Sequence, residues 1–167
     1  MYYSGINDID SVNGIGVGVA LYVSGCTHHC KGCFNPETWS FTNGDEFTDD
    51  TLNYLCDLVN RSYIDYFSVL GGEPFEPQNV NTVYKIIRHI KSINPSLVIY
   101  IWSGYLYEDL IRRSDCIKLL GLCDYLIDGE FKIELRDLRL MLRGSSNQRV
   151  IDLKKTFDNS KIFLINC

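Results

Sequence analysis

The chain has 167 residues, of which 46% are hydrophobic and 22% charged, and its formal net charge is −5. This composition is typical of one folded domain, expected over residues 1–167, and argues against a disordered chain. The acidic balance argues against non-specific nucleic-acid binding, which needs a surplus of Lys and Arg. No apolar run reaches the roughly 20 residues that span a bilayer, and the N-terminus does not resemble a signal peptide. We therefore expect a cytoplasmic protein with no membrane partner.

Apolar runs of strand length alternate with segments of helical period along the chain. Helices are predicted from a Thr48 cap through Val59, over about 79–93, and through 106–111. Such alternation predicts βαβ units and a parallel sheet covered by helices. A complete eight-unit barrel needs about 250 residues, so we expect an α/β fold forming an open, partial (βα) barrel of about five or six units with a mainly parallel sheet. The predicted strands are 18–23, 66–70, 97–102, 125–127 and 161–165, with 149–151 as a further candidate.

A polar, glycine-rich or cysteine-bearing segment follows most of these predicted strands. The segments are the cysteine loop after 18–23, Gly71-Gly72-Glu73, Ser103-Gly104 and Asp128-Gly129. In parallel α/β architectures, the carboxyl ends of the strands meet at one edge, and that edge carries the chemistry. We therefore expect these four segments to converge on one rim.

Three of the seven cysteines crowd into a C-x3-C-x2-C spacing, as Cys26, Cys30 and Cys33. Thiolates are the usual ligands of iron–sulfur clusters, and neighbouring glycines let the backbone bend around such a group. A cubic 4Fe-4S cluster has four irons, so three cysteines would leave one iron open to a substrate. The scattered cysteines are expected to be small buried hydrophobic residues; they are Cys56, Cys116, Cys123 and Cys167.

A zinc site is the alternative interpretation of the same loop. Cys30-x2-Cys33 fits half of a zinc ribbon, and His28 or His29 offers a further ligand. A structural zinc site normally closes with a second cysteine pair, and no second C-x2-C follows in this sequence. The spacing therefore favours a cluster, with both histidines lining the loop, and leaves a zinc-stabilised binding module or a non-catalytic electron carrier open.

Together with Gly71-Gly72-Glu73-Pro74, the cysteine loop resembles the radical S-adenosylmethionine superfamily. The run Phe34-Asn35-Pro36-Glu37-Thr38-Trp39 is similar to the activating enzymes of glycyl-radical proteins. The late run Arg143-Gly144-Ser145-Ser146-Asn147-Gln148-Arg149 narrows this resemblance to the enzymes that activate anaerobic ribonucleoside-triphosphate reductase. The chain departs from that pattern at Ile15, Gly18 and Leu142, where proline, arginine and tryptophan are usual.

The resemblance implies an oxidoreductase that is a glycyl-radical-generating enzyme. Cys26, Cys30 and Cys33 would hold the 4Fe-4S cluster, and S-adenosylmethionine would chelate the open iron. Reductive cleavage to a 5′-deoxyadenosyl radical would then create a glycyl radical on the reductase, the protein partner, with electrons from a flavodoxin-like donor. The nearest alternatives are an activase of another glycyl-radical enzyme and a small-molecule enzyme such as a deazapurine synthase.

The resemblance also implies roles for the rim segments. Gly71 and Gly72 would let the backbone approach the methionine end of the cofactor, and Glu73 would accept from its ammonium group. Ser103 and Gly104 would contact the cofactor's carboxylate or ribose. The run 143–149 either shapes the mouth of the site and grips the reductase, or forms a stable glycine turn with solvated arginines.

Overall fold

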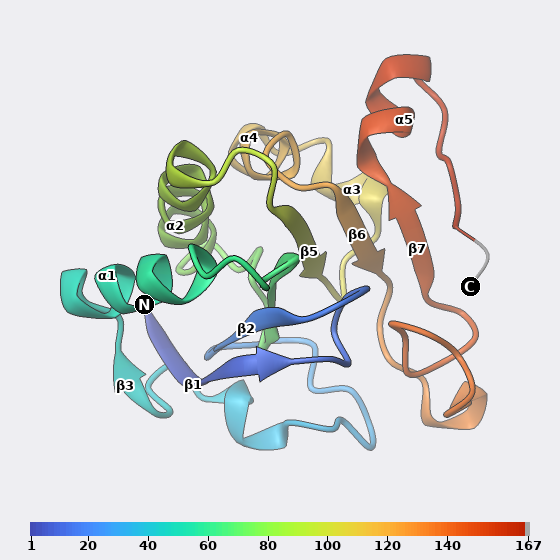
Figure 1. The fold of residues 1–167 in the computed structure, drawn as a ribbon. Helices are drawn as coiled ribbons and strands as arrows, with labels where there is room; N and C mark the ends of the chain where they lie inside the picture. The colour runs from blue at the N-terminus through green and yellow to red at the C-terminus, as the bar shows by residue number, and fades with distance from the viewer. Residues whose placement is uncertain (166–167) are drawn as a thin grey trace.

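The computed structural model describes residues 1–165; Cys167, one of the scattered cysteines, lies outside the described residues. The centre of the fold is an open seven-stranded sheet with the order β3-β1-β2-β4-β5-β6-β7 (Figure 1). β2, β4, β5 and β6 pair in parallel, whereas β1, β3 and β7 pair antiparallel to their neighbours. The strands are β1 (Tyr2–Asp10), β2 (Gly18–Val23), β3 (Asp45–Glu46), β4 (Tyr66–Gly71), β5 (Val98–Trp102), β6 (Tyr125–Asp128) and β7 (Arg149–Asp152).

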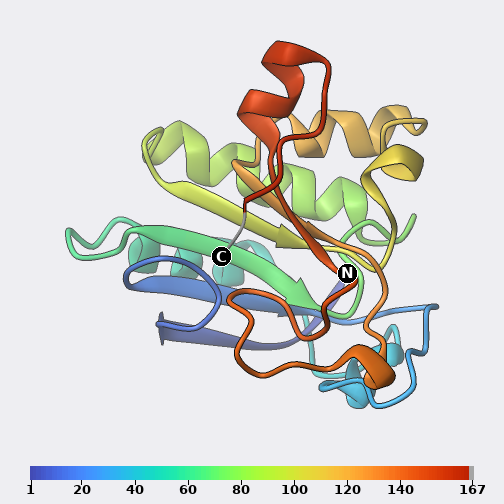
Figure 2. The ribbon, with the colours of Figure 1, turned by 90° about the vertical axis from the view of Figure 1, so that its right-hand side faces the viewer.

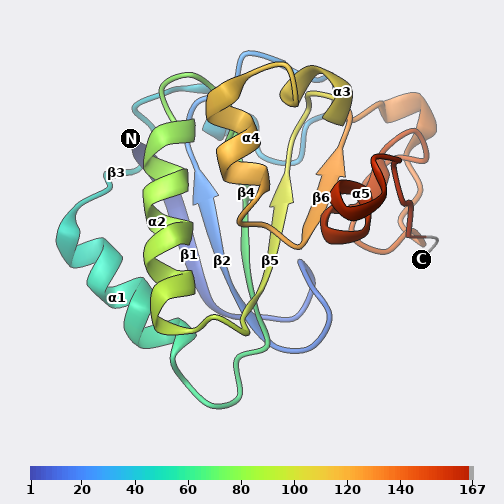
Figure 3. The same ribbon diagram turned by 90° about the horizontal axis from the view of Figure 1, so that it is seen from above.

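Helices α1, α2 and α4 cover one face of the sheet, and Figure 3 shows α2 and α4 lying over the strands. The predicted Thr48 cap is confirmed, because its hydroxyl accepts from the Thr51 amide at 3.3 Å. Within residues 1–165, none of the helices combines the length and the apolar character needed to cross a bilayer. The helices are α1 (Asp49–Val59), α2 (Val80–Ile93), α3 (Tyr107–Leu110), α4 (Ser114–Leu120) and α5 (Leu153–Asn159), with 3-10 turns η1 (Pro36–Trp39) and η2 (Ile133–Leu135).

The α/β class and the parallel centre of the sheet are confirmed, but neither the partial barrel nor the expected number of units is. The described chain has four parallel strands joined by helical crossovers, and the sheet does not close. β7 is antiparallel because the connection 129–148 holds no α-helix that would carry the chain back across the sheet. The strand predicted at 161–165 is wrong: a single bridge joins Leu164 to Ile151, and Leu164 is exposed at the sheet edge.

The face opposite the helices is closed near its centre by the loop after β1. Tyr66 is fully buried there, and its hydroxyl donates to the Asp10 carboxylate. A Cβ atom at Gly14 or Gly18 would lie 2.6 or 2.3 Å from the Tyr66 ring, so only glycine fits at either position. The Tyr66 ring thus occupies the space beside Gly18. An arginine side chain, which is usual at this position in the family that the sequence resembles, would not fit there.

Tyr66→Phe tests this arrangement. Burial alone raises the pKa of Asp10, but hydrogen bonds from Tyr66, Asn13 and Val12 outweigh it and lower the pKa below 3.8. Removing the hydroxyl should cost about 1.5–3 kcal/mol of unfolding free energy at pH 7, as for other bonds to a charged group. Because the pKa is lowered, this contribution is present above pH 3.8 and is lost as the pH falls through the folded-state value.

Urea unfolding at several pH values measures this effect. The difference between wild type and Tyr66→Phe should be largest near pH 7 and should shrink as the pH falls toward and below 3.8. Tyr125→Phe, a half-buried tyrosine on β6, is the control and should show no such pH dependence. A loss for Tyr66→Phe that is constant at every pH would contradict a charged acceptor at Asp10.

Candidate active site

A cavity of about 440 Å³ opens at the carboxyl ends of the parallel strands. Its lining comes from loops that follow β2, β4, β5 and β6, so the expected convergence on one rim is confirmed. The structure brings together all eight residues predicted for the site, although their binding roles stay predictions. They are Cys26, Cys30, Cys33, Gly71, Gly72, Glu73, Ser103 and Gly104.

The cysteine loop owes its curvature to glycines in the left-handed region. Gly25 and Gly32 have φ angles of 98° and 75°, and a Cβ at Gly25 would lie 2.2 Å from the Phe41 ring. The loop cysteines are free thiols. Burial, reinforced by the Glu73 charge, raises the pKa of Cys26 to about 11. A cation bound at this sulfur would oppose the shift and favour the thiolate.

The turn between β4 and α2 holds the backbone of the cysteine loop. The Asn79 side-chain amide donates to the carbonyl oxygens of Ser24 and Glu73 at 2.9 and 3.0 Å. One oxygen of buried Glu76 accepts from both the amide and the hydroxyl of Thr27. Sequence reasoning missed Glu76 and Asn79, although they follow Glu73 by three and six residues. These contacts shape the cysteine loop.

Glu73 joins three segments of the rim through a carboxylate that is 1% exposed. Its Oε1 accepts from the Phe75 amide and the Ser103 hydroxyl, both at 3.0 Å. Its Oε2 accepts from the Gly104 amide at 2.7 Å and lies 3.1 Å from His28 Nε2. The two oxygens therefore already have four partners within the protein.

His28 links the cysteine loop to the segments that follow β4 and β6. Its Nε2 pairs with Glu73, and its Nδ1 lies 3.2 Å from Glu130 Oε1. Burial alone would lower the pKa of His28, but these two carboxylates outweigh it and raise the pKa. With both nitrogens occupied, the imidazole offers no metal lone pair in this conformation. Exposed His29 instead stacks on Trp39, with ring centroids 4.7 Å apart.

The chain was compared with known proteins. A model of the 4Fe-4S single cluster domain family matches residues 12–151. The anaerobic ribonucleoside-triphosphate reductase-activating protein of Enterobacteria phage T4 is 37% identical over 150 residues, covering 90% of this chain and 93% of that protein. The Escherichia coli K12 protein of the same name is 38% identical over 159 residues, covering 92% and 100%. This chain belongs to that family of activating proteins. The Vibrio cholerae member is 36% identical over 150 residues, covering 89% of this chain and 96% of its own length.

The match to the 4Fe-4S single cluster domain family indicates which group the cavity could hold. The family match supports an iron–sulfur cluster in this chain, and the donor set fits one. Three free thiols from a single loop line the cavity, which is the ligand chemistry that such clusters require. Within residues 1–165, no three or more Cys, His, Asp or Glu side chains form a group that could hold a single metal ion.

The two arginines of the 143–149 run have different surroundings in this family member. Arg149 donates to both oxygens of Asp128 and of Glu108, so it joins β6, α3 and β7 and is not a solvated side chain. Arg143 lines the cavity and donates to the Gln148 carbonyl at 3.0 Å. The Leu142 carbonyl accepts from the Trp102 indole at 2.8 Å, which gives Leu142 a backbone role at the site.

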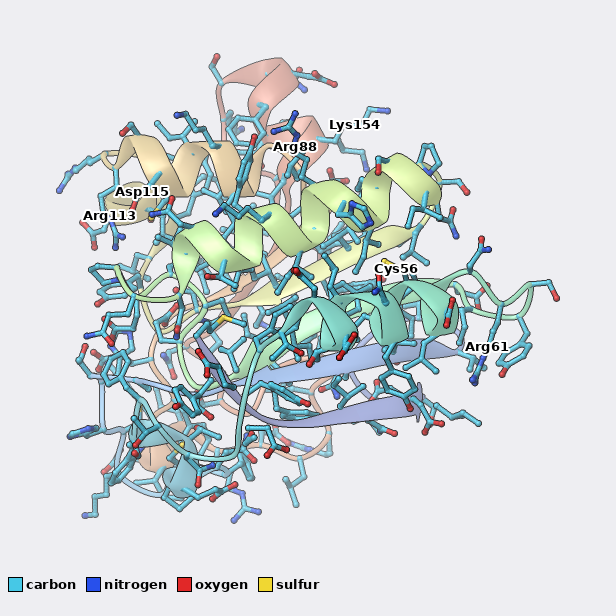
Figure 4. All side chains as sticks on the ribbon, turned by 90° about the vertical axis from the view of Figure 1, so that its left-hand side faces the viewer. Cys56, Arg61, Arg88, Arg113, Asp115 and Lys154 are labelled. Atoms are coloured by element: carbon cyan, nitrogen blue, oxygen red, sulfur yellow. The ribbon has the colours of Figure 1, made fainter. Side chains whose placement is uncertain are left out.

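The remaining described cysteines lie outside the cavity lining. Cys116 and Cys123 are buried in the apolar core, as expected, whereas Cys56 is half-buried on α1. Figure 4 places Cys56 in the helix layer. Burial raises the pKa of the Cys116 thiol to about 12, despite the opposing charge of Arg113. These cysteines are therefore packing residues.

Proposed function

We propose that this chain cleaves S-adenosylmethionine reductively and generates a glycyl radical on anaerobic ribonucleoside-triphosphate reductase. The observation that carries the proposal is the meeting of three free thiols with the Gly71-Gly72-Glu73 and Ser103-Gly104 segments in one cavity. The names of the relatives supply the partner, because those proteins activate this reductase. A flavodoxin-like protein is the proposed source of electrons.

In this proposal Cys26, Cys30 and Cys33 would hold a 4Fe-4S cluster, and the iron without a protein ligand would be open to S-adenosylmethionine. A bound cluster would supply the electron for reductive cleavage of S-adenosylmethionine, and removal of a hydrogen atom from a glycine of the reductase would follow. The residues of this chain position the reactants and exclude water.

The glycines of the rim let the ends of β2 and β4 and the cysteine loop pack closely, and in this proposal their backbone approaches the methionine end of the cofactor. A Cβ at Gly71 would lie 2.9 Å from the Tyr22 backbone, and a Cβ at Gly72 would lie 2.7 Å from the Gly25 carbonyl oxygen. These contacts explain why the rim must be built from residues without side chains. Glu73 supplies a negative charge for the ammonium group and holds Ser103 and Gly104 at their places on the rim.

Apolar side chains make up much of the remaining lining of the cavity. Such a lining keeps water away from a reactive carbon radical, which water-filled surroundings would expose to side reactions. The apolar residues include Val12, Phe34, Leu70, Trp102, Phe131, Leu138, Leu140 and Leu142.

Anaerobic reconstitution with iron and sulfide tests the proposal. The protein should turn brown, contain about four irons and four sulfides per chain, and form 5′-deoxyadenosine when reduced with the cofactor. Addition of the reductase should then give a glycyl radical signal in electron paramagnetic resonance. Colourless, zinc-loaded protein that keeps its fold would favour a binding module. Cofactor cleavage with no glycyl signal would refute the reductase as partner.

A further inference from the structure

The connection between β6 and β7 forms a loop beside the cavity that the proposed chemistry does not use. Figure 2 shows it as the orange segment on the face of the sheet away from α2 and α4. The loop folds back on itself, because the Asp137 amide donates to the Gly144 carbonyl and the Ser146 amide donates to the Leu135 carbonyl. Its tip, 137–143, brings Leu138, Leu140 and Leu142 to the lining of the cavity.

Large apolar side chains around this tip are open to solvent. Leu138 is 75% exposed and Met141 51%, and Leu135 at the base of the loop is 42% exposed. Phe34, from the end of the cysteine loop, is 54% exposed and also lines the cavity. Its ring lies 5.0 Å from the Phe131 ring, so the two segments are in contact. Exposed apolar side chains gathered beside a cavity mark a surface that another molecule covers.

The same loop is cationic in a chain that is acidic as a whole. Residues 132–143 carry Lys132, Arg136, Arg139 and Arg143 against two acidic side chains, whereas the chain has a net charge of −5. The Arg136 guanidinium lies 5.3 Å from the centre of the Phe34 ring, so charge and apolar area occur on one surface. Complementary charge steers and orients a partner, and the complement of this surface is apolar and acidic.

We propose that Phe34, Leu135, Leu138, Arg139 and Met141, which we call the collar, bind an apolar and acidic segment of the reductase that flanks the reactive glycine. This inference rests on the proposed function. A reacting hydrogen must come within about 3–3.5 Å of the attacking carbon, and a folded domain does not fit in 440 Å³. Only a short extended segment can enter, and the residues on either side of it must then lie across the mouth. A small-molecule substrate would leave the collar exposed to water.

Three variants test the collar without touching the cavity lining. Arg139→Glu reverses a surface charge that is paired with nearby Asp137, and Leu135→Ser and Met141→Ser remove exposed apolar area. Each should weaken anaerobic binding of the holoprotein to the reductase by about tenfold, the loss expected of the few residues that carry most of the binding energy at an interface. Arg139→Lys keeps the charge and should bind within about twofold of wild type.

Matched controls lie in the helix layer on the opposite face of the sheet. Arg88→Glu makes the same charge change on α2, where Figure 4 labels Arg88, and Ile117→Ser removes a side chain on α4 that is 42% exposed, as Leu135 is. Both controls should bind the reductase as wild type does. Iron content and 5′-deoxyadenosine formation without reductase should be the same in every variant.

The outcomes separate this inference from the function on which it rests. Wild-type binding by Arg139→Glu, Leu135→Ser and Met141→Ser would overturn the collar and leave the proposed function standing. Equal losses in the collar variants and in the helix-layer controls would also overturn it, because the effect would not be local. Wild-type protein that cleaves the cofactor and fails to bind the reductase would overturn the reductase as partner and the collar with it.

Discussion

Alanine at Cys26, Cys30 or Cys33 is expected to reduce cleavage of S-adenosylmethionine to below detection. The three thiols come from one loop and line one cavity. Loss of any one of them would leave two irons of the cluster without a protein ligand, where the proposed chemistry needs only one open iron. Iron and sulfide content after anaerobic reconstitution and the yield of 5′-deoxyadenosine measure this effect. All three variants should lose the brown colour.

The scattered cysteines provide the controls for this result. Cys56→Ala, on α1, should keep the cluster and the activity and lose only packing, of the order of 1 kcal/mol. Cys116→Ala should be more destabilising because its side chain is fully buried, but it should also keep the cluster. If Cys116 or Cys123 behaved like the loop cysteines, the assignment of the three ligands would be wrong.

Glu73→Gln is expected to have the second largest effect, on stability as well as on activity. The glutamine amide nitrogen would replace an oxygen that now faces the Gly104 amide and His28, or else the one that faces Phe75 and Ser103. In either orientation the glutamine NH2 group would face a backbone amide that is itself a donor, either Gly104 or Phe75, in a buried site. The free energy of unfolding should fall by about 3 kcal/mol, the scale of a broken buried ion pair.

Displacement of the rim should also slow cofactor cleavage by about a hundredfold, since a shift of about 1 Å in a positioning group has that effect. Urea unfolding of the protein before reconstitution and cleavage rates after it are the two measurements. Glu130→Gln is the matched control: Glu130 faces the other nitrogen of His28, but its side chain is 55% exposed, so it should cost less than about 1 kcal/mol. Equal losses in the two variants would show that Glu73 is not the residue that holds the rim.

Local patterns in the sequence predicted the parts of the fold that depend on local chemistry. Thr48 followed by two acidic residues predicts the start of α1, and continuous apolar runs predict β2, β4 and β5 with small errors at their ends. β1 is not predicted, because Gly5, Asn7 and Asp8 interrupt its apolar alternation, and it is stabilised by pairing with β2 along its length. Tertiary pairing decides the structure of such a segment.

The candidate site divides in the same way. Its cysteine spacing and glycine-rich turns are visible in the sequence, because each lies within a few consecutive residues. The contacts that shape it join residues far apart along the chain: His28 meets Glu130 across 102 positions, and Arg149 meets Glu108 across 41. No periodicity or motif reports such pairs. The collar is likewise recognised only when the exposure of Leu138 and its place beside the cavity are known together.

We propose that the sulfurs of Cys26, Cys30 and Cys33 hold a 4Fe-4S cluster and leave one iron for S-adenosylmethionine. Mössbauer spectroscopy of protein reconstituted with ⁵⁷Fe tests it directly, since each iron reports its own ligands. We predict that the spectrum of about one iron in four changes when S-adenosylmethionine is added, while the spectra of the other three stay the same. A spectrum that the cofactor leaves unchanged, or a site that takes up zinc in preference to iron when iron and sulfide are abundant, would contradict this account.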